Sequence, residues 1–244
     1  MTVFRHALKL DPDIAATAKL IADPSRAAML SALADGRALP SGELARIAHV
    51  TPQTASSHLD KLFKGRLLSV EVQGAHHYFR LRDARIADLL ESLSIVARPP
   101  EPLTGAQRDA SIRLRFARTC YGHLAGQLGV ALTRALCEKR FLRDGESAYA
   151  VTSAGSEWFG ELGIEVGSLQ RRPLTRRCLD WSERQHHLAG ALGVAWYGRL
   201  IELGWLARVR ESRAIRLTAH GSTALRSKLG VMLETKAVSS AAAH

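Results

Sequence analysis

The spacing of apolar residues is helical along most of the first hundred positions and alternates in one short stretch. This pattern predicts helices over residues 13–22, 24–36, 42–50, 52–65 and 85–97. Asp23-Pro24 and Thr51-Pro52 each place a capping side chain before a proline that suits the first helical position, and Ser41 is the expected cap of the third helix. Residues 67–82 alternate on both sides of a Gln-Gly pair, which predicts a β-hairpin.

The order helix, helix, tight turn, helix, two-stranded wing, helix predicts a winged helix-turn-helix over residues 1–97. The stretch ARPPEPLTG is rich in proline and poor in apolar residues, so we expect a linker at 98–105 and a second domain over 106–244. The predicted fold class is mainly α with small β wings (α+β).

The second domain contains an internal duplication. HLAGQLGVALTRALCEKRFL at 123–142 matches HLAGALGVAWYGRLIELGWL at 187–206, and YAVTSAG at 149–155 matches IRLTAHG at 215–221. The two copies cover about 106–170 and 171–234, and each resembles a winged helix without a polar recognition helix. We therefore expect tandem winged-helix-like lobes related by a pseudo-twofold axis. The glycines of these copies fit close packing between helices of the two lobes, or a small-molecule or metal pocket.

Composition adds a preference for polyanionic partners, since the formal net charge is +11. Most of the basic excess lies after residue 100, and most of these basic residues are arginines. Two arginine-rich segments, 171–177 and 208–216, either extend the surface that contacts DNA or form a solvated surface. No apolar run approaches the roughly 20 residues of a membrane span. Three cysteines do not form a disulfide framework. These features predict a cytoplasmic protein without a membrane partner.

The helix opened by Thr51 carries short polar side chains opposite an apolar face of Ala55, Leu59 and Leu62. Short side chains allow the backbone to approach the floor of a DNA major groove, where glutamine and serine read base edges while threonine and lysine reach phosphates. Histidines and an arginine on the wing suit the DNA backbone or the minor groove. The alternative is a serine-rich helix without a ligand. The predicted DNA-binding residues are Thr51, Gln53, Thr54, Ser56, Ser57, His58, Lys61, His76, His77 and Arg80.

Residues 8–97 resemble the ArsR/SmtB family of bacterial repressors. The resemblance rests on D-P-S-R at 23–26, S-x-H-L at 56–59 and the wing ending Y-F-R-L at 78–81. It implies a homodimer that assembles through the first helix and the helix at 83–97 and binds a dyad operator in double-stranded DNA. It also implies repression that a ligand or a metal relieves.

The sequence departs from the metal-binding patterns of that family. The helix before the recognition helix, GELARIAHV, contains no cysteine, and the helix at 83–97 contains Asp83, Asp88 and Glu91 but no histidine. The usual metal sites of the family therefore cannot form. Any sensing site must lie elsewhere in the chain.

The second domain offers a candidate effector or metal site. In a helical reading, Cys120 and His123 lie on one face at i, i+3, and His187 is the repeat partner of His123. Lobes that pack face to face bring the two imidazoles together, and Cys178 and Asp180 precede the second copy. Thiolate and imidazole suit a soft or borderline divalent metal. Two alternatives remain. The site binds an organic or redox ligand, or the histidine is a hydrogen-bonded core group without a ligand. The aromatic residues near this region either line such a pocket or pack in the core, and they are Trp181, Trp196, Tyr121 and Tyr197.

The sequence contains none of the glycine-rich, nucleophile or metal-protease motifs that common enzyme classes carry, so no catalytic site is predicted. The expected function is that of a sequence-specific, DNA-binding transcriptional regulator, a homodimeric repressor released by an effector in the second domain. The identity of that effector, a divalent metal or a small organic molecule, stays open. The alternative is a constitutive or architectural DNA-binding protein without an effector.

Overall fold

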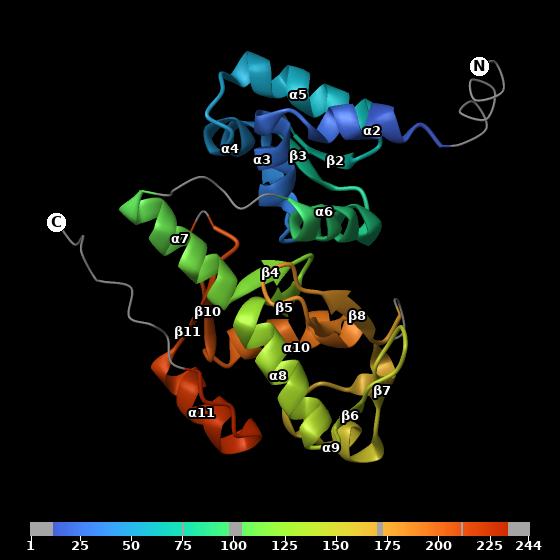
Figure 1. Cartoon of the computed structure of the whole chain (residues 1–244), viewed down its shortest axis with the longest axis vertical. Coiled ribbons are helices and arrows are strands. Elements are labelled where there is room, and N and C mark those ends of the chain that lie inside the picture. Colours follow the sequence, from blue (N-terminus) through green and yellow to red (C-terminus); the bar gives the residue numbers. More distant parts are fainter. Residues whose placement is uncertain (1–11, 75, 98–103, 170–172, 211, 234–244) are drawn as a thin grey trace. The chain divides into compact units, whose positions relative to one another are not determined.

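The computed structural model describes residues 12–74, 76–97, 104–169, 173–210 and 212–233 (Figure 1). The chain divides into two compact units, Met1–Ile86 and Ala87–His244, and the division falls inside helix α6 (Ala84–Val96). Most of the linker predicted at 98–105 lies outside the described residues. The domain limits inferred from the sequence therefore stay predictions.

The first unit has the element order of a winged helix-turn-helix. Its strands form one antiparallel sheet in the order β1-β3-β2. Strand β1, which the sequence pattern did not predict, is only two residues long and pairs Leu39 with Phe79 of β3. The elements are α2 (Ile14–Ile21), α3 (Pro24–Leu33), β1 (Leu39–Pro40), α4 (Ser41–Ile47), α5 (Pro52–Lys64), β2 (Leu68–Gln73), β3 (His76–Leu81) and the start of α6.

Side-chain caps begin two of these helices where the sequence predicts them. The Asp23 carboxylate accepts a hydrogen bond from the Arg26 amide at 3.0 Å, and the Thr51 hydroxyl accepts one from the Thr54 amide at 3.3 Å. The prediction for Ser41 is wrong, because this residue is the first of α4 and Pro40 holds the cap position without a side-chain bond. Proline supplies the fixed φ but no oxygen on its side chain.

The core of the first unit explains the orientation of α5. Ala55, Leu59 and Leu62 are buried, as the sequence predicted, and α5 packs against α4, α3 and β2. Further core side chains come from α3, α4 and β3, namely Met29, Leu30, Leu33, Leu44 and Leu81. Burial of one face of α5 leaves its polar face in solvent.

The second unit begins, after the rest of α6, with α7 (Gly105–Phe116) and then repeats one motif twice: hairpin, helix, hairpin, helix. The first copy comprises β4 (Arg118–Cys120), β5 (His123–Ala125), α8 (Gly126–Glu138), β6 (Leu142–Arg143), β7 (Ala150–Val151) and α9 (Ser153–Glu161). The second copy, after the 3-10 turn η1 (Val166–Ser168), comprises β8 (Arg176–Leu179), β9 (His186–Ala189), α10 (Gly190–Glu202), β10 (Leu206–Arg208), β11 (Ile215–Leu217) and α11 (Ala219–Leu229).

The two copies exchange contacts reciprocally. Helix α8 packs on β9 of the other copy, α10 packs on β5, and β5 also contacts β9. Leu128 and Leu132 of α8 and Leu192 and Trp196 of α10 join one apolar core. This exchange fits the pseudo-twofold relation expected from the duplicated sequence. Within the described ranges, no helix has the length and apolar character needed to span a membrane.

The stretch from Cys120 to His123 is a tight turn and not a helix, so the helical reading of this pair is wrong. Tyr121 and Gly122 both have positive φ, at 46° and 88°, as a two-residue hairpin turn requires. Cys120 and His123 face each other across this turn as a cross-strand pair of β4 and β5. The strands on either side of this turn are only three residues long, so the sequence shows too little alternation to predict them.

The repeated glycines bring each helix against its own preceding hairpin. Gly126 and Gly190 have φ of 83° and 84° where α8 and α10 begin. A Cβ at Gly129 or Gly193 would lie 2.6 Å from the carbonyl oxygen of Leu124 or Leu188. Close packing of helix on helix between the copies, the simpler expectation, is not what Gly129 and Gly193 mainly permit, although Gly193 also approaches His123 of the other copy and Gly122 approaches Val194.

Candidate functional site

Helix α5 presents the predicted recognition residues on its solvent face. Thr51, Gln53, Thr54, Ser56, Ser57 and Lys61 are exposed. His58 differs, because its side chain is only 13% exposed and its ring lies against the start of α3. Its Nδ1 is 3.4 Å from Arg26 Nη1, and its Nε2 is 4.0 Å from Asp23 Oδ1. The structure therefore gives His58 an internal role beside the exposed helix face.

Arg26 and Asp23 also explain part of the D-P-S-R motif. Besides the cap made by Asp23, Arg26 donates hydrogen bonds from Nε to the Leu20 carbonyl and from Nη2 to the Lys19 carbonyl. These carbonyls belong to the last turn of α2, so one guanidinium holds the end of α2 against the start of α3.

The wing supplies three further predicted residues. His76 and His77 are exposed at the start of β3, and Arg80 is exposed further along the strand. Arg80 forms an ion pair with Glu71 of β2. This pairing reduces the positive charge that the wing offers to a phosphate.

The second unit brings four of the five predicted effector residues to one point. Cys120 pairs with His123 across β4 and β5, and Cys178 pairs with His187 across β8 and β9. All four side chains are buried. The two Sγ atoms are 3.9 Å apart, and the two Nε2 atoms are 3.1 Å apart. The four potential ligand atoms all lie within 4.8 Å of one another.

The unequal turn lengths explain why the sequence spacing looked irregular. Two residues separate Cys120 from His123, whereas eight separate Cys178 from His187. Both pairs nevertheless occupy equivalent cross-strand positions, because the longer turn loops out beyond the pairing of the strands. Pairing register, and not distance along the chain, decides which side chains meet in a hairpin.

Asp180, the fifth predicted residue, lies behind His187 and not among the four ligand atoms. Its Oδ2 is 3.4 Å from His187 Nδ1 and accepts a hydrogen bond from the Gly126 amide at 2.7 Å. The same oxygen is 3.1 Å from Nη2 of Arg118. The carboxylate is therefore close enough to attract a proton on Nδ1 of His187, although the structure forms no hydrogen bond between them.

Arg118 is a residue that sequence reasoning missed. Its side chain is completely buried, and Nη2 lies 3.2 Å from Oε2 of Glu91 on α6 as well as beside Asp180. The guanidinium carbon is 4.7 Å from the centroid of the Trp181 ring. Arg213 approaches the other Glu91 oxygen at 3.8 Å. No short-range pattern marks Arg118, because its partners are distant in the sequence.

The local environment favours the neutral forms of Cys120 and His123 when no cation is bound. A hydrogen bond with Cys178, and then burial, raises the pKa of the Cys120 thiol to about 12. Burial lowers the pKa of His123. Burial alone would raise the pKa of Asp180, but Arg118 and His187 outweigh it and lower the value to about 2. A divalent cation bound between the sulfurs favours the deprotonated form of a thiol, because the positive charge stabilises the thiolate.

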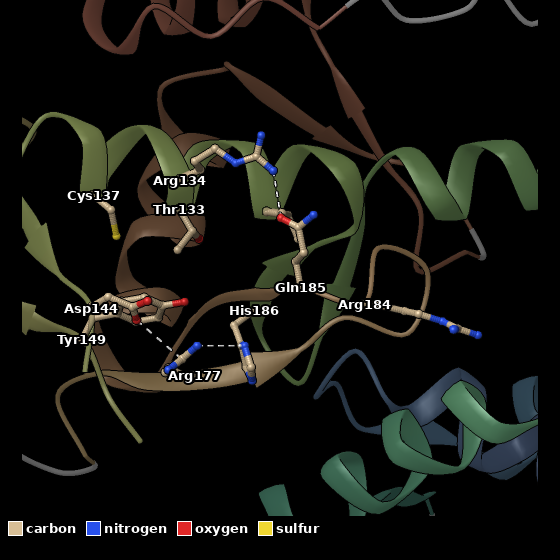
Figure 2. A pocket seen from close by; sticks show the side chains of 10 residues that line it. Thr133, Arg134, Cys137, Asp144, Tyr149, Arg177, Arg184, Gln185 and His186 are labelled. Carbon is tan, nitrogen blue, oxygen red and sulfur yellow. Dashed lines mark hydrogen bonds and ion pairs between the residues drawn. The ribbon is translucent and has the colours of Figure 1, made fainter. Parts of the chain in front are cut away.

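A separate pocket of about 340 Å³ is lined by His186, which precedes the cluster's His187 on β9, and by none of the four cluster residues (Figure 2). Two of its three arginines already have partners: Arg134 donates to Gln185 at 2.8 Å, and Arg177 lies 3.1 Å from His186 Nδ1. The lining residues are Val130, Thr133, Arg134, Cys137, Asp144, Tyr149, Arg177, Arg184, Gln185 and His186.

The aromatic residues considered for an organic pocket lie elsewhere. Trp196 and Tyr197 are buried in the apolar core, and Trp181 stacks with Arg118. None of these three lines the pocket of Figure 2. The core alternative therefore describes Trp196 and Tyr197.

Comparisons with known proteins agree with the fold of the first unit. A family model described as a helix-turn-helix domain matches residues 21–71. The uncharacterized HTH-type transcriptional regulator YdfF of Bacillus subtilis (strain 168) is 44% identical over 226 residues, which are 92% of this chain and 100% of that protein. The chain belongs to the HTH-type transcriptional regulators. Its winged helix-turn-helix is of the ArsR type, which confirms the resemblance seen in the sequence.

Solved structures of regulators resemble only part of this chain. The homodimeric winged helix-turn-helix DNA-binding domain of Mb0332 from Mycobacterium bovis is 25% identical, with a TM-score of 0.34, and the match covers 39% of this chain and 86% of that one. The cadmium metal-sensor CMTR from Mycobacterium tuberculosis is 29% identical, with a TM-score of 0.31, over 37% of this chain and 96% of that one.

In this HTH-type regulator, the matched segment contains α5 and its packing partners α3 and α4. The Cys and His cluster lies outside that segment, in the second unit. The relative from Bacillus subtilis aligns with 92% of the chain, so its similarity extends well into the second unit.

Proposed function

We propose that this HTH-type regulator is a homodimeric repressor that binds a dyad operator through α5 and is released when an effector binds its second unit. The observation that carries the DNA-binding part is the division of α5 into two faces. Ala55, Leu59 and Leu62 fix the helix to the core, while short polar side chains on the opposite face stay in solvent.

The exposed residues divide by the part of DNA that they suit. Gln53 and Ser57 carry groups that hydrogen-bond base edges in the major groove. Thr51 and Lys61 suit phosphates, and His76 and His77 on the wing suit the DNA backbone or the minor groove. The net charge of +11 favours this polyanion.

Exposed apolar side chains support a dimer of the kind that the ArsR resemblance implies. Helix α2 buries none of its residues, and Ile14 is 75% exposed. On α6, Val96 is 79% exposed and Leu93 is also exposed. Burying such side chains against a second copy is favourable at roughly 25 cal/mol per Å².

We assign effector binding to the second unit. Its two copies act as tandem winged-helix-like lobes around a buried polar cluster. Similarity to a transcriptional regulator over most of the chain supports a regulator rather than an enzyme, and a cytoplasmic location follows from that role. A constitutive or architectural DNA-binding protein is the competing function, and it differs in having no effector.

Selection of duplexes from a random pool by the full-length protein tests this function. We expect an enriched sequence with two half-sites about 10–10.5 base pairs apart or a multiple of that spacing, as a twofold dimer requires. Binding to all duplexes with equal affinity, by a protein that is folded and dimeric, would overturn the proposed function.

A further inference from the structure

We propose that Cys120, His123, Cys178 and His187 form a tetrahedral site for one divalent cation of the Zn²⁺ type, and that its occupancy is the signal that this regulator senses. The second clause rests on the proposed function. The first does not, because the geometry of the four residues carries it independently of DNA.

The distances within the cluster match a tetrahedron around such a cation. With Zn–S of about 2.3 Å and Zn–N of about 2.0–2.1 Å, a regular tetrahedron separates two sulfurs by about 3.8 Å and two nitrogens by about 3.3 Å. The structure has 3.9 Å between the Sγ atoms and 3.1 Å between the Nε2 atoms. Two thiolates and two imidazoles are also a donor set that suits Zn²⁺.

Burial separates this cluster from a chance gathering of polar side chains. All four residues are buried, and the small side chains of Ala125 and Ala189 pack beside the two thiols. Without a cation, the two Nε2 atoms contact each other, the two Sγ atoms contact each other, and the buried Nδ1 of His187 has no hydrogen-bond partner. A cation coordinated by all four atoms satisfies each of them at once.

A disulfide accounts for fewer of these features. Cys120 and Cys178 are free thiols with Sγ atoms 3.9 Å apart, well beyond the roughly 2.05 Å of a disulfide bond. A disulfide would also leave unexplained why each cysteine has a histidine opposite it in register, with the two imidazoles meeting at the same point.

The surroundings of His187 complete the site. Asp180 lies 3.4 Å from Nδ1 of His187, on the opposite side of the ring from the Nε2 that faces the cluster. Nδ1 has no hydrogen-bond partner in the structure, and a small movement of the ring toward this carboxylate would supply the hydrogen bond that ligating histidines commonly make through their other nitrogen. The Gly126 amide and Arg118 hold this carboxylate in turn.

Each copy of the duplication supplies one cysteine and one histidine. A bound cation therefore joins the two hairpins, and with them α8 and α10, which pack across the copies. The same contacts lead from His187 through Asp180 and Arg118 to Glu91 on α6. Helix α6 begins within the first unit at Ala84, so it is the covalent route from the site to the DNA-binding unit.

Cobalt titration of the reduced full-length protein tests the site directly. We expect one Co²⁺ per chain, with sulfur-to-cobalt charge-transfer bands and the strong visible bands of tetrahedral coordination, and displacement of Co²⁺ by Zn²⁺. C120S, C178S and H187Q should each lose these bands. C137S is the matched control, because Cys137 is a free cysteine outside the cluster, and it should behave as the parent.

X-ray absorption of the zinc-loaded parent protein needs no variant to fold. We expect two sulfurs at about 2.3 Å and two nitrogens at about 2.0–2.1 Å. The absence of stoichiometric binding, a coordination shell without sulfur, or bands that survive in both C120S and C178S would overturn the site. Formation of a Cys120–Cys178 disulfide that zinc neither prevents nor competes with would also overturn it.

Operator binding separates failure of the site from failure of the proposed function. If the parent protein binds its operator sequence-specifically but binds no metal, the proposed cation site is wrong and the DNA-binding proposal stands. Metal binding in a protein without any operator preference overturns the proposed function and leaves the site standing. Metal binding that leaves operator affinity unchanged overturns the sensing role alone.

Discussion

Cys120 and Cys178 occupy equivalent positions in two copies of one hairpin, and their sulfur atoms are 3.9 Å apart. Each has a histidine directly opposite it on the neighbouring strand. The structure therefore brings two equivalent Cys and His pairs, one from each copy, to the same point. A gene duplication that stacks two such hairpins produces a four-ligand site without either copy containing more than two ligands.

Zinc is expected to stabilise the second unit by binding the folded state. At a free concentration of one hundred times the dissociation constant, the gain in free energy of unfolding is about 2.7 kcal/mol. Thermal unfolding of the parent with zinc and with a chelator measures this gain. C137S should show the same increase in Tm and C178S should show none; an equal increase in all three proteins would mean that zinc binds elsewhere.

Ser57→Ala and Gln53→Ala are expected to weaken operator binding without changing dimer stability. Each lost base contact costs about 1–3 kcal/mol, because the partner group on the base is left unpaired. Fluorescence anisotropy with the selected operator measures the change. Ser31→Ala makes the same chemical change at an exposed position on α3 and is the control; equal effects at Ser31 and Ser57 would remove α5 from base reading.

Lys61→Ala is expected to weaken binding to all duplexes by a similar factor. A lost phosphate contact lowers the number of released counterions, so the slope of log K against log salt should fall in magnitude by about 1. The measurement is a salt titration of operator and of non-specific DNA. An unchanged slope would place Lys61 outside the phosphate contacts.

Arg118→Met is expected to destabilise the second unit strongly. The substitution leaves Asp180 and Glu91 buried without their shared cation, which costs about 3–5 kcal/mol. Denaturant unfolding in the presence of a chelator measures this cost apart from metal binding. Lys64→Met removes an exposed partner of Asp60 and should cost at most about 1 kcal/mol; similar losses in both variants would argue against the buried network.

Gly193→Ala is expected to destabilise α10, whereas Gly198→Ala on the same helix is expected to be neutral or stabilising. A Cβ at Gly193 meets the Leu188 carbonyl oxygen at 2.6 Å, and one at Gly198 meets nothing within 4 Å. Alanine at an unstrained helical glycine stabilises by about 0.4–1 kcal/mol. Unfolding of the two variants under one set of conditions provides the comparison, and a reversed order would contradict the close approach of helix and hairpin.

The winged helix-turn-helix was predictable because its signals are local. A capping threonine followed by proline begins α5, its apolar face is periodic, and the Gln-Gly pair ends β2. The position of β1 was not predictable, since two residues carry no period and the strand exists only through its pairing with β3.

The candidate site was predictable in its residues but not in its construction. Cys120, His123, Cys178 and His187 stood out by chemistry and by the repeat, yet the cross-strand pairing was hidden. The longer turn after Cys178 concealed its equivalence to Cys120, because a sequence offset detects only equal spacing. Arg118 was invisible, since its importance arises from packing between distant segments.

The most direct test of the account is the operator affinity of the full-length protein with zinc and with a chelator, measured side by side for the parent, C178S and C137S. Allosteric coupling of ordinary strength predicts that zinc weakens operator binding by about 5–150-fold in the parent and in C137S. C178S should bind the operator with one affinity under both conditions. Equal affinities of the parent with and without one bound zinc per chain would contradict the account.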